Sequence, residues 1–98
     1  MRPRFFVEPE AEAELNEAFQ WYESRVAGLG GEFTRAVRAV FAMIDRNPEQ
    51  FGRVQGEIRR VLVRRFPYAI YYVFDPEQIS VIACVHTRGH PRRWQSRR

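Results

Sequence analysis

Residues 58–74 constrain the fold of this chain more than any other stretch. Residues 66–74 (FPYAIYYVF) are apolar at nearly every position and rich in aromatic and β-branched side chains. A strand with one exposed face would alternate apolar and polar residues, so this run predicts a central strand that is covered on both faces. Residues 60–64 (RVLVR) form a second run, and Pro67 cannot donate a ladder hydrogen bond. The two runs predict a β-hairpin that turns within residues 63–67.

The two faces of this hairpin follow from the alternation of side chains along each strand. A turn at Arg64 and Arg65 and a turn at Phe66 and Pro67 both place odd-numbered residues of the first strand opposite even-numbered residues of the second. One face is predicted to face the core and carries Val61, Val63, Tyr68, Ile70, Tyr72 and Phe74. The other face is mixed and cationic and carries Arg60, Leu62, Arg64, Ala69, Tyr71 and Val73.

The rest of the chain predicts two helices and two further strands. A short strand at residues 4–7 is followed by Pro9 and a run of glutamates, which favour a helix start, and Gly28 ends that helix. A second amphipathic helix ends at Asn47-Pro48, and a last strand covers residues 79–87. The order β-α-α-β-β-β predicts an α+β fold, in which a helical hairpin packs on one face of an antiparallel sheet.

The faces of the last strand depend on the turn that precedes it. Asp75 and Pro76 suit a type I turn, and this turn would place Phe74 opposite Ile79. We then expect Ile79, Val81, Ala83 and Val85 on the core face. We expect Ser80, Ile82, Cys84 and His86 on the mixed face, with His86 level with Pro67 and close to Arg64, Arg65 and Arg88.

Length and charge limit the functions that the chain can have. Its 98 residues suffice for one domain with one modest core, which we place at residues 1–98 with a basic tail at residues 89–98. All sixteen basic side chains are arginines. Residues 1–49 hold six arginines and nine acids, whereas residues 50–98 hold ten arginines and three acids. The cationic half contains the predicted sheet, so an acidic or polyanionic partner is expected.

Several other classes of protein do not fit the sequence. No apolar run approaches the ~20 residues of a membrane span, and residues 1–4 do not lead into the apolar stretch of a signal peptide, so we expect a cytoplasmic protein. Cys84 is the only cysteine, which leaves no disulfide framework. His86 and His90 lack the further ligands of a zinc site. We therefore expect no metal and no cofactor.

Motifs spread over nearly the whole chain resemble the RelE/ParE superfamily of bacterial type II toxins. The most specific are residues 65–72 (RFPYAIYY) and residues 86–94 (HTRGHPRRW). Weaker ones are the acidic helix start at residues 8–15 (EPEAEAEL), Trp21-Tyr22, residues 28–33 (GLGGEF) and Asn47-Pro48. The second half of the chain is more similar to the ParE and plasmid-stabilisation side of the superfamily than to the RelE side.

The resemblance implies a toxin that stops growth and is held inactive by a small acidic antitoxin encoded beside it. Members on the ParE side inhibit DNA gyrase without catalysis, and members on the RelE side cut mRNA in the ribosome with basic side chains. The ParE-like gyrase inhibitor is our first hypothesis. A RelE-like ribosome-dependent mRNA endonuclease is the second, and a silent member that only binds its antitoxin is the third.

The nuclease hypothesis assigns roles to three residues. RelE-side enzymes place an arginine just before the central strand and a histidine or tyrosine at the end of the last one, and Arg65 and His86 match these positions. Arg60 would add charge to stabilise the phosphorane. No tyrosine follows Tyr72, and a longer tail follows His86, so the acid–base pair is incomplete. An arginine at a strand edge is also typical of a solvated surface, and a histidine at a strand end is more often a surface residue than a catalyst.

The binding hypothesis assigns a larger set of residues to contacts with the target or the antitoxin. It comprises Arg64, Tyr71, Leu62, Arg88, Arg92, Arg93 and Trp94. An acidic antitoxin segment that is disordered when free is expected to fold over apolar positions ringed by arginines. These apolar positions are Leu62, Ile82, Phe19 and Trp21. For Trp94, packing against the body of the protein is the main alternative to a binding role.

Overall fold

The secondary structure follows the predicted order, with one short strand and one short helix added. The computed structural model describes residues 2–97. Its elements are β1 (Arg4–Val7), α1 (Pro9–Arg25), α2 (Leu29–Arg46), β2 (Arg53–Gln55), β3 (Ile58–Leu62), β4 (Tyr68–Phe74), β5 (Gln78–His86) and α3 (Arg92–Gln95). Pro9 occupies the first turn of α1, where no N–H donor is needed, and Gly28 takes the left-handed conformation (φ 90°) that turns the chain from α1 into α2.

The five strands form one sheet in the order β1-β5-β4-β3-β2. The pairs β2–β3, β3–β4 and β4–β5 are antiparallel, whereas β1 pairs with β5 in parallel. The α+β fold with a helical hairpin is therefore confirmed, with the difference that the sheet is mixed. Just after β1, the Glu8 N–H donates a hydrogen bond to the Val81 carbonyl at 2.9 Å. This bond extends the parallel pairing of β1 with β5 to the start of α1.

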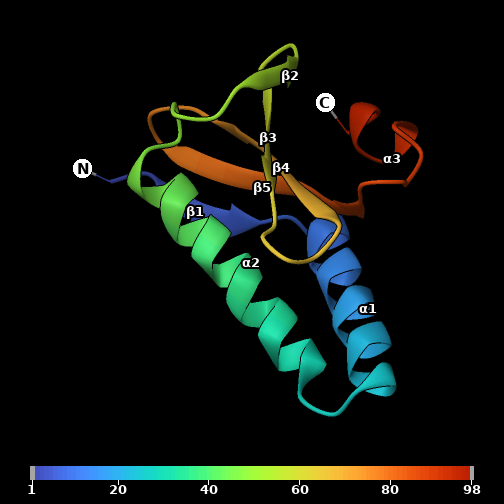
Figure 1. Ribbon diagram of the computed structural model, residues 1–98. Helices are drawn as coiled ribbons and strands as arrows, with labels where there is room; N and C mark the ends of the chain where they lie inside the picture. Colours follow the sequence, from blue (N-terminus) through green and yellow to red (C-terminus); the bar gives the residue numbers. More distant parts are fainter. Residues whose placement is uncertain (1, 98) are drawn as a thin grey trace.

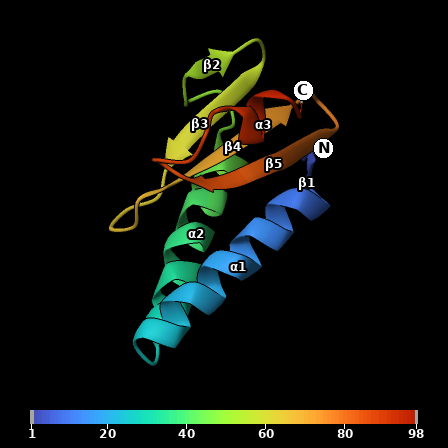
Figure 2. The same ribbon diagram turned by 90° about the vertical axis from the view of Figure 1, so that its right-hand side faces the viewer.

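The helices cover both faces of the sheet. Figures 1 and 2 show α1 and α2 side by side on one face and the short α3 on the opposite face. The larger core lies between the helical hairpin and the sheet and includes Ala18, Tyr22, Phe33, Val37, Val40, Ile44, Ile70 and Tyr72. A second, smaller core lies under α3 and includes Ile58, Ala69, Tyr71, Ile82, Ala83, Val85 and Trp94. Among residues 2–97, no helix is both long and apolar enough to cross a membrane.

The predicted faces of the β3–β4 hairpin are confirmed, except that Arg64 lies in the turn and lines a groove beside α2. Val61 lies opposite Ile70, and the Val63 N–H donates to the Tyr68 carbonyl at 2.9 Å. The sequence suggested two registers, and the observed register is intermediate between them. As in both of those, odd-numbered residues of β3 lie opposite even-numbered residues of β4. All six residues expected on the core face belong to the larger core or pack against it.

The predicted faces of β5 are right for its first half and wrong for its second half. Tyr72 lies opposite Val81 but Tyr71 lies opposite Ala83, so Ile82 is an extra residue, a β-bulge, in β5. From the bulge onwards, the extra residue reverses which side chains of β5 face the helical hairpin and which face α3. Ala83 and Val85 consequently lie in the core under α3, and Cys84 and His86 face the helical hairpin. The expectation that placed His86 on the mixed, cationic face is thereby corrected.

The basic tail is anchored to the sheet. Residues 92–95 of this tail form α3, an element that the sequence did not predict. Trp94 is buried, and its ring stacks on Tyr71 with centroids 4.4 Å apart and an interplanar angle of 13°. The expectation that Trp94 packs against the body of the protein is confirmed.

Candidate functional site

The predicted site residues occupy three separate surfaces. Arg64 and Arg65 lie in the turn between β3 and β4 and face α2. His86 lies at the end of β5 and faces α1, together with Arg93. Arg60, Leu62, Tyr71 and Trp94 belong to the face of the sheet that carries α3.

The turn between β3 and β4 presents its two arginines beside α2. Arg65 has φ 71°, the left-handed conformation that a residue with a side chain seldom adopts. Its Nη2 donates to Glu32 Oε1 at 3.0 Å, and this ion pair connects the turn to α2. A groove of about 390 Å³ lies between them, and we call it the α2 groove. It is lined by Glu32, Arg35, Ala36, Ala39, Val40, Met43, Arg64 and Arg65.

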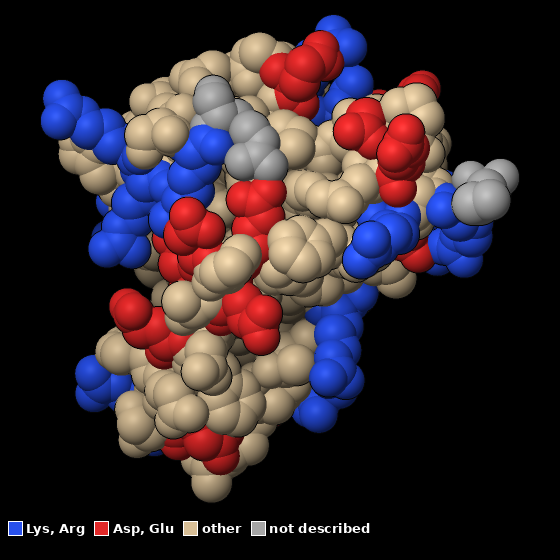
Figure 3. Space-filling view, turned by 180° about the vertical axis from the view of Figure 1, so that it is seen from behind, with Lys and Arg blue, Asp and Glu red and all other residues tan. Residues whose placement is uncertain are grey.

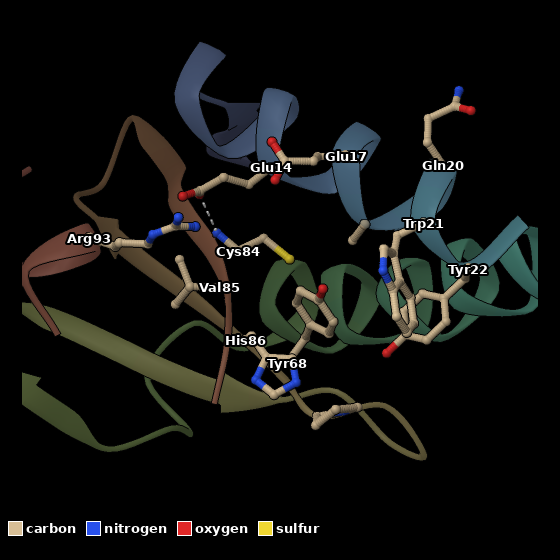
Figure 4. Close-up of a pocket in the computed structure, with 12 residues that line it drawn as sticks. Glu14, Glu17, Gln20, Trp21, Tyr22, Tyr68, Cys84, Val85, His86 and Arg93 are labelled. Atoms are coloured by element: carbon tan, nitrogen blue, oxygen red, sulfur yellow. Dashed lines mark hydrogen bonds between the residues drawn. The ribbon is translucent and has the colours of Figure 1, made fainter. Parts of the chain in front are cut away.

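His86 lines a larger cavity on the other side of the hairpin. This cavity, the α1–β5 cleft, has a volume of about 740 Å³. It is lined by Glu14, Glu17, Ala18, Gln20, Trp21, Tyr22, Pro67, Tyr68, Cys84, Val85, His86 and Arg93. Figure 4 shows the rings of Tyr68 and His86 on one side and Glu17 and Trp21 on the other. The His86 ring lies edge-on to Tyr68 with centroids 5.3 Å apart, and its Nδ1 accepts a hydrogen bond from the Arg88 N–H at 3.1 Å.

Burial raises the pKa of one thiol and two phenols that line the cleft. Burial raises the pKa of the Cys84 thiol to about 12, and the nearby Glu14 carboxylate adds to this effect. Burial also raises the pKa of Tyr68 and of Tyr22. A thiol with such a pKa is not a nucleophile near neutral pH. The cleft is thus lined by aromatic rings and by a thiol that stays protonated near neutral pH.

The face that carries α3 is mostly covered. Tyr71 stacks under Trp94, so both of these predicted contact residues are buried, and Ile82 is buried as well. Leu62 is 59% exposed and is available to a partner. Arg60 lies opposite Tyr71 on the neighbouring strand, so it shares this face and is exposed.

The remaining predicted contact residues follow β5. Arg88, Arg92 and Arg93 are exposed, and the N–H of Arg92 donates to His90 Nδ1 at 3.2 Å at the start of α3. On α1, Trp21 is 52% exposed and the guanidinium of Arg25 lies over its ring at 4.6 Å. Seen from behind, carboxylates gather along the middle of the molecule, and the guanidinium groups lie mainly towards its edges (Figure 3).

The three candidate catalytic residues do not converge. Arg65 reaches towards Glu32 in the α2 groove, His86 points into the α1–β5 cleft, and Arg60 lies on the α3 side of the sheet. General acid–base catalysis needs its groups within hydrogen-bonding reach of one substrate. Within residues 2–97, no three His, Cys, Asp or Glu side chains are grouped closely enough to hold a metal ion.

Sequence analysis missed two features of the site. Arg35 was not singled out, and neither were Ala36, Ala39, Val40 and Met43, which have the i, i+3, i+4, i+7 spacing of an apolar stripe. That spacing could have indicated the α2 groove. The pairing of Glu14 with Arg97 joins residues 83 apart and has no signal in the sequence.

The comparisons with known proteins identify the fold. No protein-family profile matches this sequence, and no curated protein matches it. A solved structure described as the chromosomal ParDE TA system from P. aeruginosa is similar, with a TM-score of 0.74 and 13% sequence identity. The match covers 87% of this chain and 96% of that chain. This chain therefore shares the fold of that structure.

Proposed function

We propose that this protein, with residues 1–98 acting as one domain, is the toxin of a type II toxin–antitoxin module. It acts in the cytoplasm, inhibits DNA gyrase by binding and is neutralised by a cognate antitoxin. The toxin-like fold and the ParDE system named for the similar structure support this class. The motifs in residues 65–72 and 86–94, which resemble the ParE side, favour gyrase over the ribosome.

The dispersal of Arg65, His86 and Arg60 over three surfaces is the observation that carries the choice of a non-catalytic mechanism. Cleavage of RNA without a metal ion needs a base for the 2′-hydroxyl, cations for the phosphorane and an acid for the leaving oxygen. His86 has Tyr68 beside it and is separated from Arg60 by the thickness of the sheet, since the two residues belong to opposite faces. This arrangement favours binding over catalysis.

The surface proposed to bind gyrase is the cationic turn and tail. Arg64 and Arg65 are exposed in the turn, and Arg88, Arg92 and Arg93 are exposed after β5. Leu62, which is exposed on β3 just before the turn, adds an apolar contact. Charged residues at the rim of an interface mainly raise the rate of association, and their effect decreases as salt is added.

Supercoiling by purified gyrase tests the proposal. The wild-type protein is expected to inhibit it, and a variant with Arg64→Ala and Arg65→Gly is expected to inhibit less, with a difference that shrinks as the salt concentration is raised. Gly at position 65 keeps the left-handed backbone accessible, so the second substitution removes the charge without straining the turn. Arg38→Ala, an exposed arginine elsewhere on α2, is the matched control and should inhibit like the wild type.

His86→Gln separates the two mechanisms. For a gyrase inhibitor nothing at position 86 needs to change protonation, so the variant should remain toxic when expressed in bacteria without an antitoxin. For a nuclease the same change would remove proton transfer and lower the rate about 10²–10⁴-fold. Supercoiling that is undisturbed by the wild-type protein, together with a non-toxic His86→Gln variant, would overturn gyrase inhibition in favour of mRNA cleavage.

A further inference from the structure

The α1–β5 cleft is lined by aromatic rings from three elements. Two of these rings, those of Trp21 and Tyr22, come from α1. Tyr68, the first residue of β4, and His86, the last residue of β5, supply two more. The Tyr68 ring lies edge-on to both Tyr22 and His86, with centroids 6.1 and 5.3 Å apart. With a volume of about 740 Å³, the cleft is large enough for a small molecule.

The wall that α1 contributes is negative, although the chain as a whole is basic. Residues 8–23 hold six glutamates and no arginine. Two of these glutamates, Glu14 and Glu17, line the cleft, and Glu14 is already paired with Arg97 at 2.9 Å. Glu17 is exposed and forms no ion pair within residues 2–97. One carboxylate is thus left to pair with a cation that enters the cleft.

Glu17 and the Trp21 ring lie beside each other on α1. They are four residues apart, which places them on the same face of the helix. The guanidinium of Arg25 lies over the Trp21 ring at 4.6 Å, so this ring already attracts one cation. Arg25 does not line the cleft, whereas Trp21 does. The part of the ring that borders the cleft is therefore open to a second cation.

The positive charge in the lining stands away from this ring. Among the described residues, Arg93 is the only arginine that lines the cleft. Figure 4 shows Arg93 and Trp21 at opposite ends of the cleft, with Tyr68 between them. The His86 Nδ1 accepts a hydrogen bond from the Arg88 N–H, so that nitrogen carries no proton and the imidazole is neutral in this arrangement. The end of the cleft at Trp21 is therefore aromatic and negative.

We propose that the α1–β5 cleft binds a small organic cation of the alkylammonium or quaternary ammonium class. The cation lies against the Trp21 ring and pairs with Glu17, and its hydrocarbon groups contact Tyr22 and Tyr68. The negative charge on the face of an aromatic ring attracts a cation, and the attraction is stronger where water is excluded. The field of the α1 wall selects a cation over an anion.

The aromatic lining selects an organic cation over a metal ion. Ca²⁺ and Mg²⁺ bind through oxygen ligands, and within residues 2–97 no three His, Cys, Asp or Glu side chains are grouped closely enough to hold a metal ion. Methyl and methylene groups, in contrast, gain from contact with aromatic rings. The site adds a ligand to the proposed toxin and does not depend on which target the toxin has.

A heteronuclear NMR titration of the isotope-labelled protein with choline tests the site. Choline should shift the indole N–H signal of Trp21 and leave that of Trp94, which is buried under α3, in place. The neutral isostere of choline, in which a tert-butyl group replaces the trimethylammonium group, should bind about five- to thirtyfold more weakly. The anion tert-butylacetate should bind no better than this alcohol. Equal affinity for choline and the alcohol would overturn the proposal, because the cleft would then recognise shape alone.

Substitutions on α1 locate the cation. Trp21→Leu keeps an apolar side chain but removes the ring, and it should weaken choline binding about fivefold or more. Trp21→Phe keeps a ring and should lose less. Glu17→Gln keeps the shape of the side chain and removes its charge, so it should weaken binding about three- to fivefold at low salt and less at high salt. Both positions are exposed, so folding should be retained, and circular dichroism checks it.

Glu12→Gln is the matched control, because Glu12 is an exposed acid on α1 that does not line the cleft. It should keep the wild-type affinity within about twofold. Choline that does not bind to the wild type, or that binds equally to Trp21→Leu and Glu17→Gln, would overturn the proposal. A shift of the Trp94 signal without one of Trp21 would do so too. None of these results would affect the proposed toxin function, which the supercoiling assay tests separately.

Discussion

Glu14 and Arg97 form an ion pair in which two N–H groups of the guanidinium donate to the two carboxylate oxygens, at 2.9 and 3.0 Å. The Cys84 N–H donates to the same carboxylate at 3.0 Å, and Arg97 also donates to the Ile82 carbonyl at 2.9 Å. These backbone groups lie on β5 just after its pairing with β1 ends at Val81. The ion pair therefore takes the place of a neighbouring strand at the bulge and ties the end of the chain to α1.

Glu14→Ala should lower the free energy of unfolding by about 2–3 kcal/mol, because it removes the carboxylate that accepts hydrogen bonds from the Cys84 N–H and from two N–H groups of Arg97. The side chains of Glu14 and Arg97 are only 15% and 20% exposed, so water replaces the lost bonds poorly. Glu12→Ala, an exposed acid on the same helix, should cost under about 0.5 kcal/mol. Equal midpoints for the two variants in chemical denaturation would show that the ion pair is not structural.

The backbone conformation of Arg65 predicts that the effect of a substitution on stability will depend on the shape of the new side chain. Its φ of 71° is strained for a β-branched residue and unstrained for glycine. Arg65→Val should therefore lower the free energy of unfolding by about 1–3 kcal/mol. Arg65→Gly should change it by less than about 1 kcal/mol, since the ion pair with Glu32 is exposed. Arg64→Val, at the exposed neighbouring position, is the control, and a loss as large as that of Arg65→Val would contradict this account.

Ile70 is fully buried at the centre of the larger core. Ile70→Ala should lower the free energy of unfolding by about 2–5 kcal/mol, a large share of the stability of a chain of this size. Arg38→Ala, on the exposed side of α2, should cost under about 0.5 kcal/mol. Chemical denaturation of the two variants compares these values directly. If both substitutions proved equally mild, the central place of Ile70 in the core would have to be abandoned.

The free energy of unfolding should decrease as the pH rises above about 8.5. Burial raises the pKa of Cys84 and that of Tyr72 to about 12 in the folded protein. In the unfolded chain these groups ionise near about 8.5 and 10. Their contribution to stability is therefore fully present below pH ~8.5 and is lost progressively as the pH rises towards 12. The free energy of unfolding, measured by urea denaturation at a series of pH values, should show this decline.

Cys84→Ala isolates the share of the thiol in this decline. The variant has no group that ionises between pH ~8.5 and 10 at this position, so its stability should fall less steeply there than that of the wild type. The Tyr72 share, which begins at about pH 10, should persist. Parallel curves for the wild type and the variant over this interval would mean that Cys84 ionises as readily in the folded protein as in the unfolded chain.

Local patterns were enough for the long elements of this fold, but not for β2 and α3, and they were enough for the core face of the hairpin. Apolar residues at helical spacing indicated α1 and α2, and the parity of Val61 and Ile70 followed from alternation alone, whichever turn was chosen. The motifs at residues 65–72 and 86–94 indicated the RelE/ParE-like fold. The packing of Trp94 could also be expected, because a large aromatic side chain gains from burial.

The sequence by itself determined the two long helices and four of the five strands, and the tertiary structure decided where His86 points. Residues 79–85 are apolar at almost every position, so apolar and polar side chains do not alternate along them. The sequence therefore does not reveal the bulge at Ile82. In a strand that is buried on both faces, either set of alternate side chains can face the helical hairpin. Long-range contacts therefore decide which set does so. These contacts come from α1 and from the segment after α3, above all from Glu14 and Arg97, and they exist only once the chain has folded.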